Sequence, residues 1–253
     1  MTLCATIRAA LLAVVVVAAS PALAQEKTGS KPGFMLQPRS VKIVLVRPSI
    51  RVGAQSTGGM FEPNADWTSQ ARDNIAAALK AQQATLGNEI IESDDTAGPD
   101  AALATQYSSL FGTVADSVIE YQFFKGNRLP TKKKQKNAFD WGVGPEISRL
   151  SALKGADYAL FINSDDAYGS TGRKVLQVVA FMARIPVTSG VHKGYAGLVD
   201  LKTGELVWLN ADRQMGGDVR TKDGAEKRVR QLLEGFPGAP VQAPAPAPTS
   251  AAR

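Results

Sequence analysis

Short apolar runs alternate with amphipathic stretches in the first half of the chain. Residues 41–46 (Val-Lys-Ile-Val-Leu-Val) are mostly β-branched and apolar, which is typical of a strand buried on both faces of an α/β sheet, and Pro48 ends it. From Asp66, apolar residues recur at steps of three and four, which predicts a helix that closes at Gly87. Residues 89–92 then predict a second, short strand.

The same alternation continues into the second half. Pro99, at a first helical position, predicts a helix that runs to about Phe123, and Pro145 predicts a shorter helix. Residues 156–162 (Ala-Asp-Tyr-Ala-Leu-Phe-Ile) predict another central strand. The polar, glycine-containing segment 163–173 that follows predicts a loop.

The last third contains one ambiguous run and one clear signal. Residues 175–182 are almost continuously apolar, which fits a buried helix or a buried strand, and we expect the helix. Residues 195–200 and 205–210 predict the two strands of a β-hairpin, because Gly204 can adopt the positive φ that a tight turn requires. A helical pattern then predicts a C-terminal helix that Pro237 ends.

These elements predict one α/β domain over residues 41–236. We expect a mixed sheet with helices on its faces, ending in a β-hairpin and a C-terminal helix. The hydrophobic content of 44% supports a globular domain. The polar, Gly- and Pro-containing segment 25–40 predicts a flexible linker, and the Ala/Pro-rich segment 237–253 predicts a disordered tail.

The start of the chain has the pattern of a secretory signal peptide over residues 1–24. Arg8 is its only charge, residues 9–19 form the apolar run, and Ala22-Leu23-Ala24 is a small-x-small cleavage site. A membrane-spanning helix needs roughly 20 apolar residues, so a retained anchor is the weaker alternative. We therefore expect cleavage after Ala24, a periplasmic protein, and no transmembrane segment in the mature chain.

Export and composition exclude several kinds of chemistry. Cleavage removes Cys4, the only cysteine, so the mature chain has no disulfide, thiol nucleophile or thiolate metal site. His192 is the only histidine and lies in a Gly-bounded polar segment. The sequence contains no G-x-S-x-G motif that would supply a serine nucleophile for a histidine base. We expect His192 in a solvated loop. Complete phosphate-loop and dinucleotide patterns are missing from the sequence, so we expect no cofactor, no metal site and no enzyme activity.

Charge favours an anionic partner. The net charge is +6, and loss of Arg8 leaves +5. A moderate positive excess favours polyanionic surfaces, and export argues against nucleic acid. An envelope protein or an anionic envelope surface is therefore the expected partner. The densest cluster of cations fits a solvated loop or a basic binding patch, and it consists of Lys132, Lys133, Lys134 and Lys136.

The end of the predicted strand 156–162 supplies the candidate binding site. In open α/β sheets, ligands bind beyond the carboxyl ends of strands. If this strand lies parallel and close to strand 41–46, polar residues from two segments face each other across one crevice. These residues are Arg47, Ser49 and Arg51 on one side and Asp165, Asp166, Tyr168 and Arg173 on the other. Trp141, in a Gly- and Pro-rich loop, is the first candidate for an exposed aromatic anchor.

The order of elements resembles the α/β domain shared by the TolB amino-terminal domain and the curli-export lipoprotein family, envelope proteins of Gram-negative bacteria. The likeness lies in strand 41–46, in strand 156–161, and in the hairpin 198–208 (Leu-Val-Asp-Leu-Lys-Thr-Gly-Glu-Leu-Val-Trp). It covers about residues 41–236, and the lipidated cysteine of the curli-export family is missing. The resemblance implies a fold and a compartment, and it transfers no catalytic residue.

The sequence therefore predicts a non-enzymatic envelope protein that binds a protein partner or an anionic envelope component. A periplasmic hydrolase that uses Asp165 and Asp166, with or without a divalent ion, is the alternative. A third hypothesis is a component of a larger assembly that pairs through an exposed strand edge.

Overall fold

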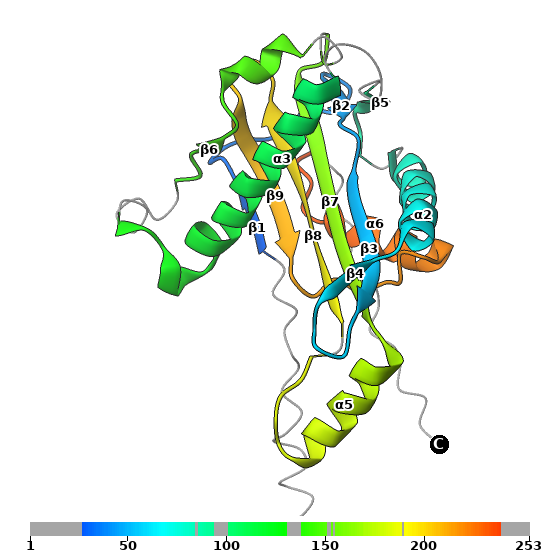
Figure 1. Ribbon diagram of the computed structural model, residues 1–253. Coiled ribbons are helices and arrows are strands. Elements are labelled where there is room, and N and C mark those ends of the chain that lie inside the picture. The colour runs from blue at the N-terminus through cyan, green and yellow to red at the C-terminus, as the bar shows by residue number, and fades with distance from the viewer. Residues whose placement is uncertain are drawn as a thin grey trace, which may run out of the picture.

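The computed structural model describes residues 27–83, 86–93, 101–130, 138–150, 153, 155–188 and 190–238. These residues form one mixed β-sheet with helices on both faces (Figure 1), which confirms the predicted α/β class. The described strands are β1 (Lys27–Ser30), β2 (Lys42–Leu45), β3 (Ser49–Gln55), β4 (Phe61–Pro63), β5 (Glu89–Glu92), β6 (Trp141–Gly142), β7 (Tyr158–Gly169), β8 (Val191–Asp200) and β9 (Glu205–Asp212). The main helices are α2 (Ala65–Gln83), α3 (Ala101–Val118), α5 (Thr171–Met182) and α6 (Lys222–Leu232).

The long strand β7 organises the sheet, whose order is β1-β9-β8-β7-β2-β5. On one side β7 pairs antiparallel with β8. On the other side it pairs parallel with β2 along its first half and with β3 along its second half. Pro48 lies between β2 and β3, where the missing N–H of proline interrupts the ladder. The prediction that Pro48 ends the first strand is correct, and β3 then continues along the same edge of β7.

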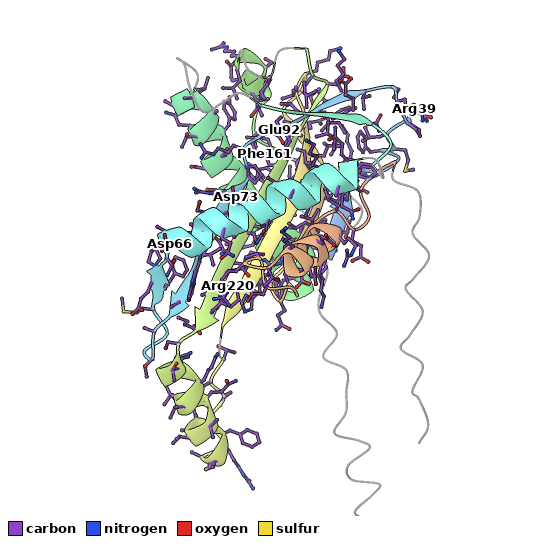
Figure 2. All side chains as sticks on the ribbon, turned by 90° about the vertical axis from the view of Figure 1, so that its right-hand side faces the viewer. Arg39, Asp66, Asp73, Glu92, Phe161 and Arg220 are labelled. Atoms are coloured by element: carbon purple, nitrogen blue, oxygen red, sulfur yellow. The ribbon has the colours of Figure 1, made fainter. Side chains whose placement is uncertain are left out.

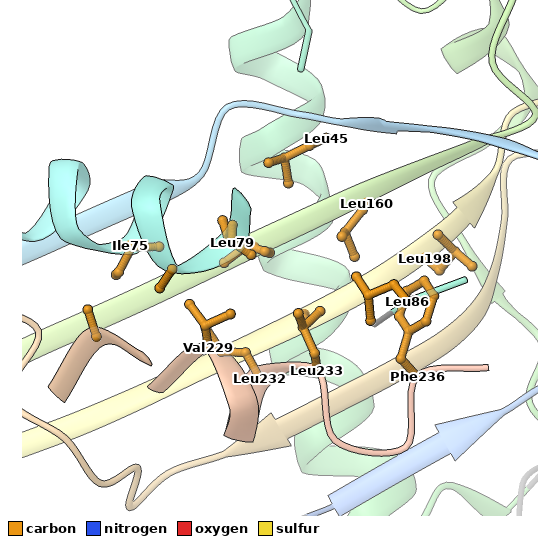
Figure 3. Close-up of a cluster of buried hydrophobic side chains, with 14 of the residues drawn as sticks. Leu45, Ile75, Leu79, Leu86, Leu160, Leu198, Val229, Leu232, Leu233 and Phe236 are labelled. Atoms are coloured by element: carbon orange, nitrogen blue, oxygen red, sulfur yellow. The ribbon is translucent and has the colours of Figure 1, made fainter. Parts of the chain in front are cut away.

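Two hydrophobic layers cover the two faces of the sheet. On one face, Ile75 and Leu79 of α2 meet Val229 and Leu232 of α6 above Leu160 of the sheet (Figure 3). Figure 2 shows α2 lying across this face with α6 beside it. On the other face lies α3, which continues through a π-helical turn (Ile119–Phe123). The predicted helices that begin near Asp66 and end near Phe123 are confirmed over the described residues.

Close packing of α3 depends on a small residue in the sheet. The Phe111 ring stacks on the Phe161 ring at a centroid distance of 4.6 Å. A Cβ atom at Gly197 would lie 2.6 Å from the Phe111 ring, so only glycine permits this approach. The sheet and α3 are therefore fitted to each other at one aromatic contact.

The predicted C-terminal hairpin is confirmed as β8 and β9. Gly204 in its turn has φ of 72°, as the sequence pattern requires. The turn also packs tightly, because a Cβ atom at Gly204 would lie 2.1 Å from the carbonyl oxygen of Gly144. Trp208 on β9 is buried in the core, edge-on to Phe236.

Three predictions of local structure are wrong. Part of the predicted linker 25–40 is a strand, since β1 pairs antiparallel with β9 at the edge of the sheet. Segment 163–173 is not a loop, because β7 extends to Gly169 and α5 begins at Thr171. Residues 175–182 are helical as expected, but the helix is exposed instead of buried, with Ala180 its only buried residue among those described.

Other predictions fall outside the described residues: the signal peptide 1–24, Pro99, the four lysines of the basic cluster, and most of the tail 237–253. Among the described helices, none combines the length and apolar character needed to cross a membrane.

Candidate functional site

The second half of β7 places its polar side chains alternately on the two faces of the sheet. Because successive side chains of a strand point in opposite directions, Asp165 lies on the α3 face, whereas Ser164 and Asp166 lie on the α2/α6 face. Asp165 and Asp166 therefore point apart. The two carboxylates lie on a strand instead of the predicted loop, and they do not converge as the alternative of a two-metal hydrolase would require.

Asp166 is the centre of a buried ionic cluster. Its Oδ1 accepts a hydrogen bond from Arg228 Nη2 at 2.7 Å, and its Oδ2 accepts one from Arg228 Nη1 at 2.7 Å. Ser164 Oγ donates to Asp166 Oδ2 at 2.9 Å and accepts from Arg228 Nη1 at 2.6 Å. Arg228 is 0% exposed and Asp166 is 1% exposed. This is a bidentate ion pair removed from water, between the central strand and α6.

The guanidinium of Arg228 is fully used within the protein. Its Nε donates to the carbonyl of Gly216 and its Nη2 to the carbonyl of Gly217, both at 3.1 Å. Since a guanidinium carries five N–H donors, these bonds and those to Asp166 and Ser164 leave none for a ligand. The cluster fastens α6 and the segment before it to the sheet.

His192 completes this cluster, although the sequence predicts it in a solvated loop. It lies on β8, and its Nδ1 is 2.8 Å from Asp166 Oδ1. The His192 ring packs against the Tyr168 ring at a centroid distance of 4.9 Å, and the His192 side chain is 30% exposed. The expectation of a loop residue is wrong because the glycines around His192 lie within or beside the strand and do not end it.

The neighbours of Asp166 lower the pKa of its carboxyl group despite its burial. Burial, the largest single influence, raises the pKa of this carboxyl group, but the hydrogen bonds from His192, Arg228 and Ser164 and the positive charge of Arg228 together lower it by more. The net effect is a lowered pKa. Asp166 is thus held as a carboxylate whose two oxygens are occupied, which leaves it unsuited to ligate a metal ion. Over the described part of the chain, no three His, Cys, Asp or Glu side chains converge as metal ligands.

Tyr168, another predicted site residue, belongs to an aromatic and cationic stack. The Arg220 guanidinium lies over the Tyr168 ring at 3.7 Å and over the Trp67 ring at 4.5 Å from the centroid. Asp218 forms a bidentate pair with Arg220, at 2.7 and 2.9 Å, and this pairing lowers the pKa of Asp218 to about 2. The stack joins α2, β7 and the segment before α6, so it stabilises the fold (Figure 2 labels Arg220).

On the α3 face, the structure brings together two of the predicted crevice residues. Arg51 Nε donates to Asp165 Oδ1 at 2.6 Å, and Lys193 Nζ lies 3.5 Å from Asp165 Oδ2. Strand pairing places Arg51 directly opposite Asp165. Arg47 and Ser49 are exposed residues at the start of the same segment. The Arg51 side chain is 63% exposed and that of Lys193 38%, whereas the Asp165 side chain between them is 12% exposed.

Trp141 is not an exposed anchor. It lies in the two-residue strand β6, opposite Leu206 of β9, and is half-buried against the core beneath α3. The structure therefore separates it from the other predicted site residues.

Arg173 holds the start of α5 in place. Its Nη1 donates to the carbonyl of Thr57 in the β3–β4 turn, and its Nε donates to the carbonyl of Thr188, both at 3.0 Å. Ser170 caps the helix by accepting a hydrogen bond from the backbone N–H of Arg173. Both contacts of the Arg173 guanidinium are to neutral carbonyls.

Helix α5 and the turn after it, residues 171–188, form a projection beyond the end of the sheet (Figure 1), which we call the α5 projection. Phe181 is 81% exposed and Met182 is 79% exposed. Five further large apolar side chains of the projection are exposed: Val175, Leu176, Val178, Val179 and Ile185. A helix that is apolar around most of its circumference normally lies in a core or in a membrane.

The projection ends in a defined turn. The N–H of Ile185 bonds to the carbonyl of Ala180 at 2.8 Å, and the N–H of Arg184 bonds to that of Phe181 at 3.0 Å. This is a Schellman motif with Arg184 in the left-handed position, φ 58°, which glycine usually occupies. The charged side chain of Arg184 therefore lies at the tip of the projection, at a backbone position that is strained for a residue other than glycine.

Comparisons with known proteins find structural likenesses of low score. Neither a family model nor a curated protein matches the chain. Among solved structures, the chain is similar to a PelC dodecamer from Paraburkholderia phytofirmans, with 15% identity over 86% of this chain and 98% of that chain and a TM-score of 0.33. It is also similar to a PelC point variant from the same organism, with 13% identity over 82% and 94% of the two chains and a TM-score of 0.34. Scores this low carry no argument about function.

Proposed function

We propose that this chain is an exported protein of the cell envelope that acts by binding another envelope component, and that the α5 projection carries its binding surface. The observation that supports this most directly is the exposure of seven large apolar side chains on one projection. Contiguous exposed apolar surface of this kind is typical of interaction sites. The export signal predicted over residues 1–24 supports the compartment, and the resemblance to TolB-type and curli-export domains stays a prediction.

The polar clusters favour binding over catalysis. Asp166, Ser164 and Arg228 are engaged with one another, and Asp165 is paired with Arg51 and Lys193. A hydrolase needs a nucleophile or metal-bound water beside a free base. The most promising acidic residues of the sequence instead stabilise the fold.

Sedimentation of the mature chain with isolated envelope fractions tests the proposal. Phe181→Ser combined with Met182→Ser should abolish sedimentation, because both side chains are exposed and their loss removes apolar surface without disturbing the core. Met35→Ser combined with Leu110→Ser is the matched control, since Met35 and Leu110 are also exposed but lie elsewhere. Equal sedimentation of both double variants and the parent chain would overturn the proposal.

A further inference from the structure

We propose that the component bound by the α5 projection is the surface of an anionic lipid bilayer, with the helix lying in the head-group region and its tip inserted. This inference rests on the function proposed above and names the partner. The apolar tip consists of Phe181, Met182 and Ile185.

The charge distribution of the projection is the first argument. Between Asp166 and Asp200 the sequence contains no acidic residue, and its cations in that interval are Arg173, Lys174, Arg184 and Lys193. Within the described residues, no carboxylate forms an ion pair with the three cations of the projection itself. Exposed apolar residues next to unneutralised cations are the combination that interfacial helices use on anionic membranes.

The position of the cations relative to the apolar tip is the second argument. Arg173 and Lys174 lie at the start of α5, and Arg184 is the second residue after its end, next to Ile185 of the tip. Long cationic side chains can reach back to the head groups while neighbouring apolar side chains enter the acyl region. The left-handed turn at Arg184 folds the chain back, so that the backbone N–H of Ile185 bonds to the carbonyl of Ala180 in the last turn of the helix.

A second copy of the chain fits the same surface less well. In a symmetric dimer each projection would meet its own copy. That contact would place Lys174 and Arg184 of the two chains near one another, and like charges at an interface are unfavourable. A bilayer with anionic head groups matches the apolar tip and the cations at once.

Co-flotation with vesicles tests this inference directly. The mature chain is mixed with vesicles of phosphatidylcholine alone or of equal parts phosphatidylcholine and phosphatidylglycerol. We expect flotation with the anionic vesicles only, and a loss of at least about tenfold in molar salt, since exposed charges are then screened. Phe181→Ser/Met182→Ser and, separately, Lys174→Glu/Arg184→Glu should each reduce partitioning by at least about tenfold. Met35→Ser/Leu110→Ser should float as the parent chain does.

The outcomes separate this inference from the function on which it rests. Flotation that is equal on neutral and anionic vesicles overturns the role of charge. If the chain does not float but its sedimentation with envelope fractions still depends on α5, the lipid inference is wrong and the partner is a protein. No flotation, together with a dimer in light scattering that Phe181→Ser/Met182→Ser dissociates, shows that a second copy occupies the surface. Binding that no α5 variant weakens overturns both the lipid inference and the proposed function.

Discussion

At the scale of single residues, the fold depends on a buried ion pair that replaces apolar packing in one part of the core. Asp166 and Arg228 satisfy each other and their neighbours. Such a pair need not be more stabilising than apolar residues of the same shape, but breaking it is costly, because one charge is left buried and unpaired.

Arg228→Met should therefore destabilise the protein by about 3–5 kcal/mol, because it leaves the Asp166 carboxylate buried without its main partner. Urea unfolding followed by circular dichroism measures this free energy. Asp166→Leu combined with Arg228→Met should cost much less than the sum of the two single variants, since both charges are removed together. Additive costs would show that the pair does not act as a unit.

The pH dependence of stability provides a second test of the same pair. Because the pKa of Asp166 is lowered in the folded protein, its contribution is complete above the pKa of an unfolded aspartate, about 3.9. It is lost as the pH falls from there through the folded pKa. We expect the urea midpoint to decrease below about pH 4 in the parent chain, and to decrease less in Asp166→Leu/Arg228→Met. An identical pH profile for the two proteins would contradict this assignment.

At the scale of elements, the sequence correctly predicts the strands whose apolar pattern comes from burial in the core alone. Residues 41–46, 156–162 and the β8–β9 hairpin are apolar because they cross the core, so their patterns identify them. The second half of β7 could not be predicted as a strand in this way, because Asn-Ser-Asp-Asp has the composition of a turn. The tertiary partners of Asp166, Arg228 at 62 residues away and His192 on β8, make this carboxylate acceptable inside a sheet.

For helix α5, the sequence predicts the element correctly but not its exposure. Its apolar run predicts a helix correctly, but burial is a property of the surroundings, and here the surrounding elements stop short of it. The α5 projection could not be predicted as a binding surface for the same reason, because its apolar residues have the pattern of core residues and only the fold exposes them.

The hairpin turn offers a test at this scale. Gly204→Ala should destabilise the protein by more than about 1 kcal/mol, because it combines a positive φ with a clash against the Gly144 carbonyl. Gly33→Ala is the control for backbone strain alone, since Gly33 has φ of 76° and nothing within 4 Å of an added Cβ atom. Thermal unfolding compares the two variants. A cost at Gly204 no larger than that at Gly33 would remove the clash from the explanation.

The exposure of α5 makes a contrasting prediction about stability. Phe181→Ser should change the free energy of unfolding by less than about 0.5 kcal/mol, as surface substitutions usually do. Phe111→Ala, beneath α3, should cost about 3–5 kcal/mol. Chemical denaturation of both variants in the absence of lipid measures the difference. A large cost at Phe181 would mean that α5 packs against the domain.

At the scale of the whole molecule, the sheet has two unlike ends. The hairpin turn at residues 201–204 closes one end, and the α5 projection extends from the other (Figure 1). Polar clusters on both faces between these ends are engaged in holding the elements together. The apolar and cationic projection is the part of the described structure whose surface the fold itself does not explain.

A fluorescent probe on the projection tests whether it is the binding surface. Cys4 lies within residues 1–24 and is the only cysteine, so a chain that begins at Gln25 can be labelled at one introduced position with an environment-sensitive dye. With anionic vesicles, the dye at Phe181→Cys should brighten and shift to the blue, while the dye at Lys202→Cys, in the turn at the opposite end of the sheet, should not change. No change at position 181, or equal changes at both positions, would contradict the claim that α5 is the binding surface.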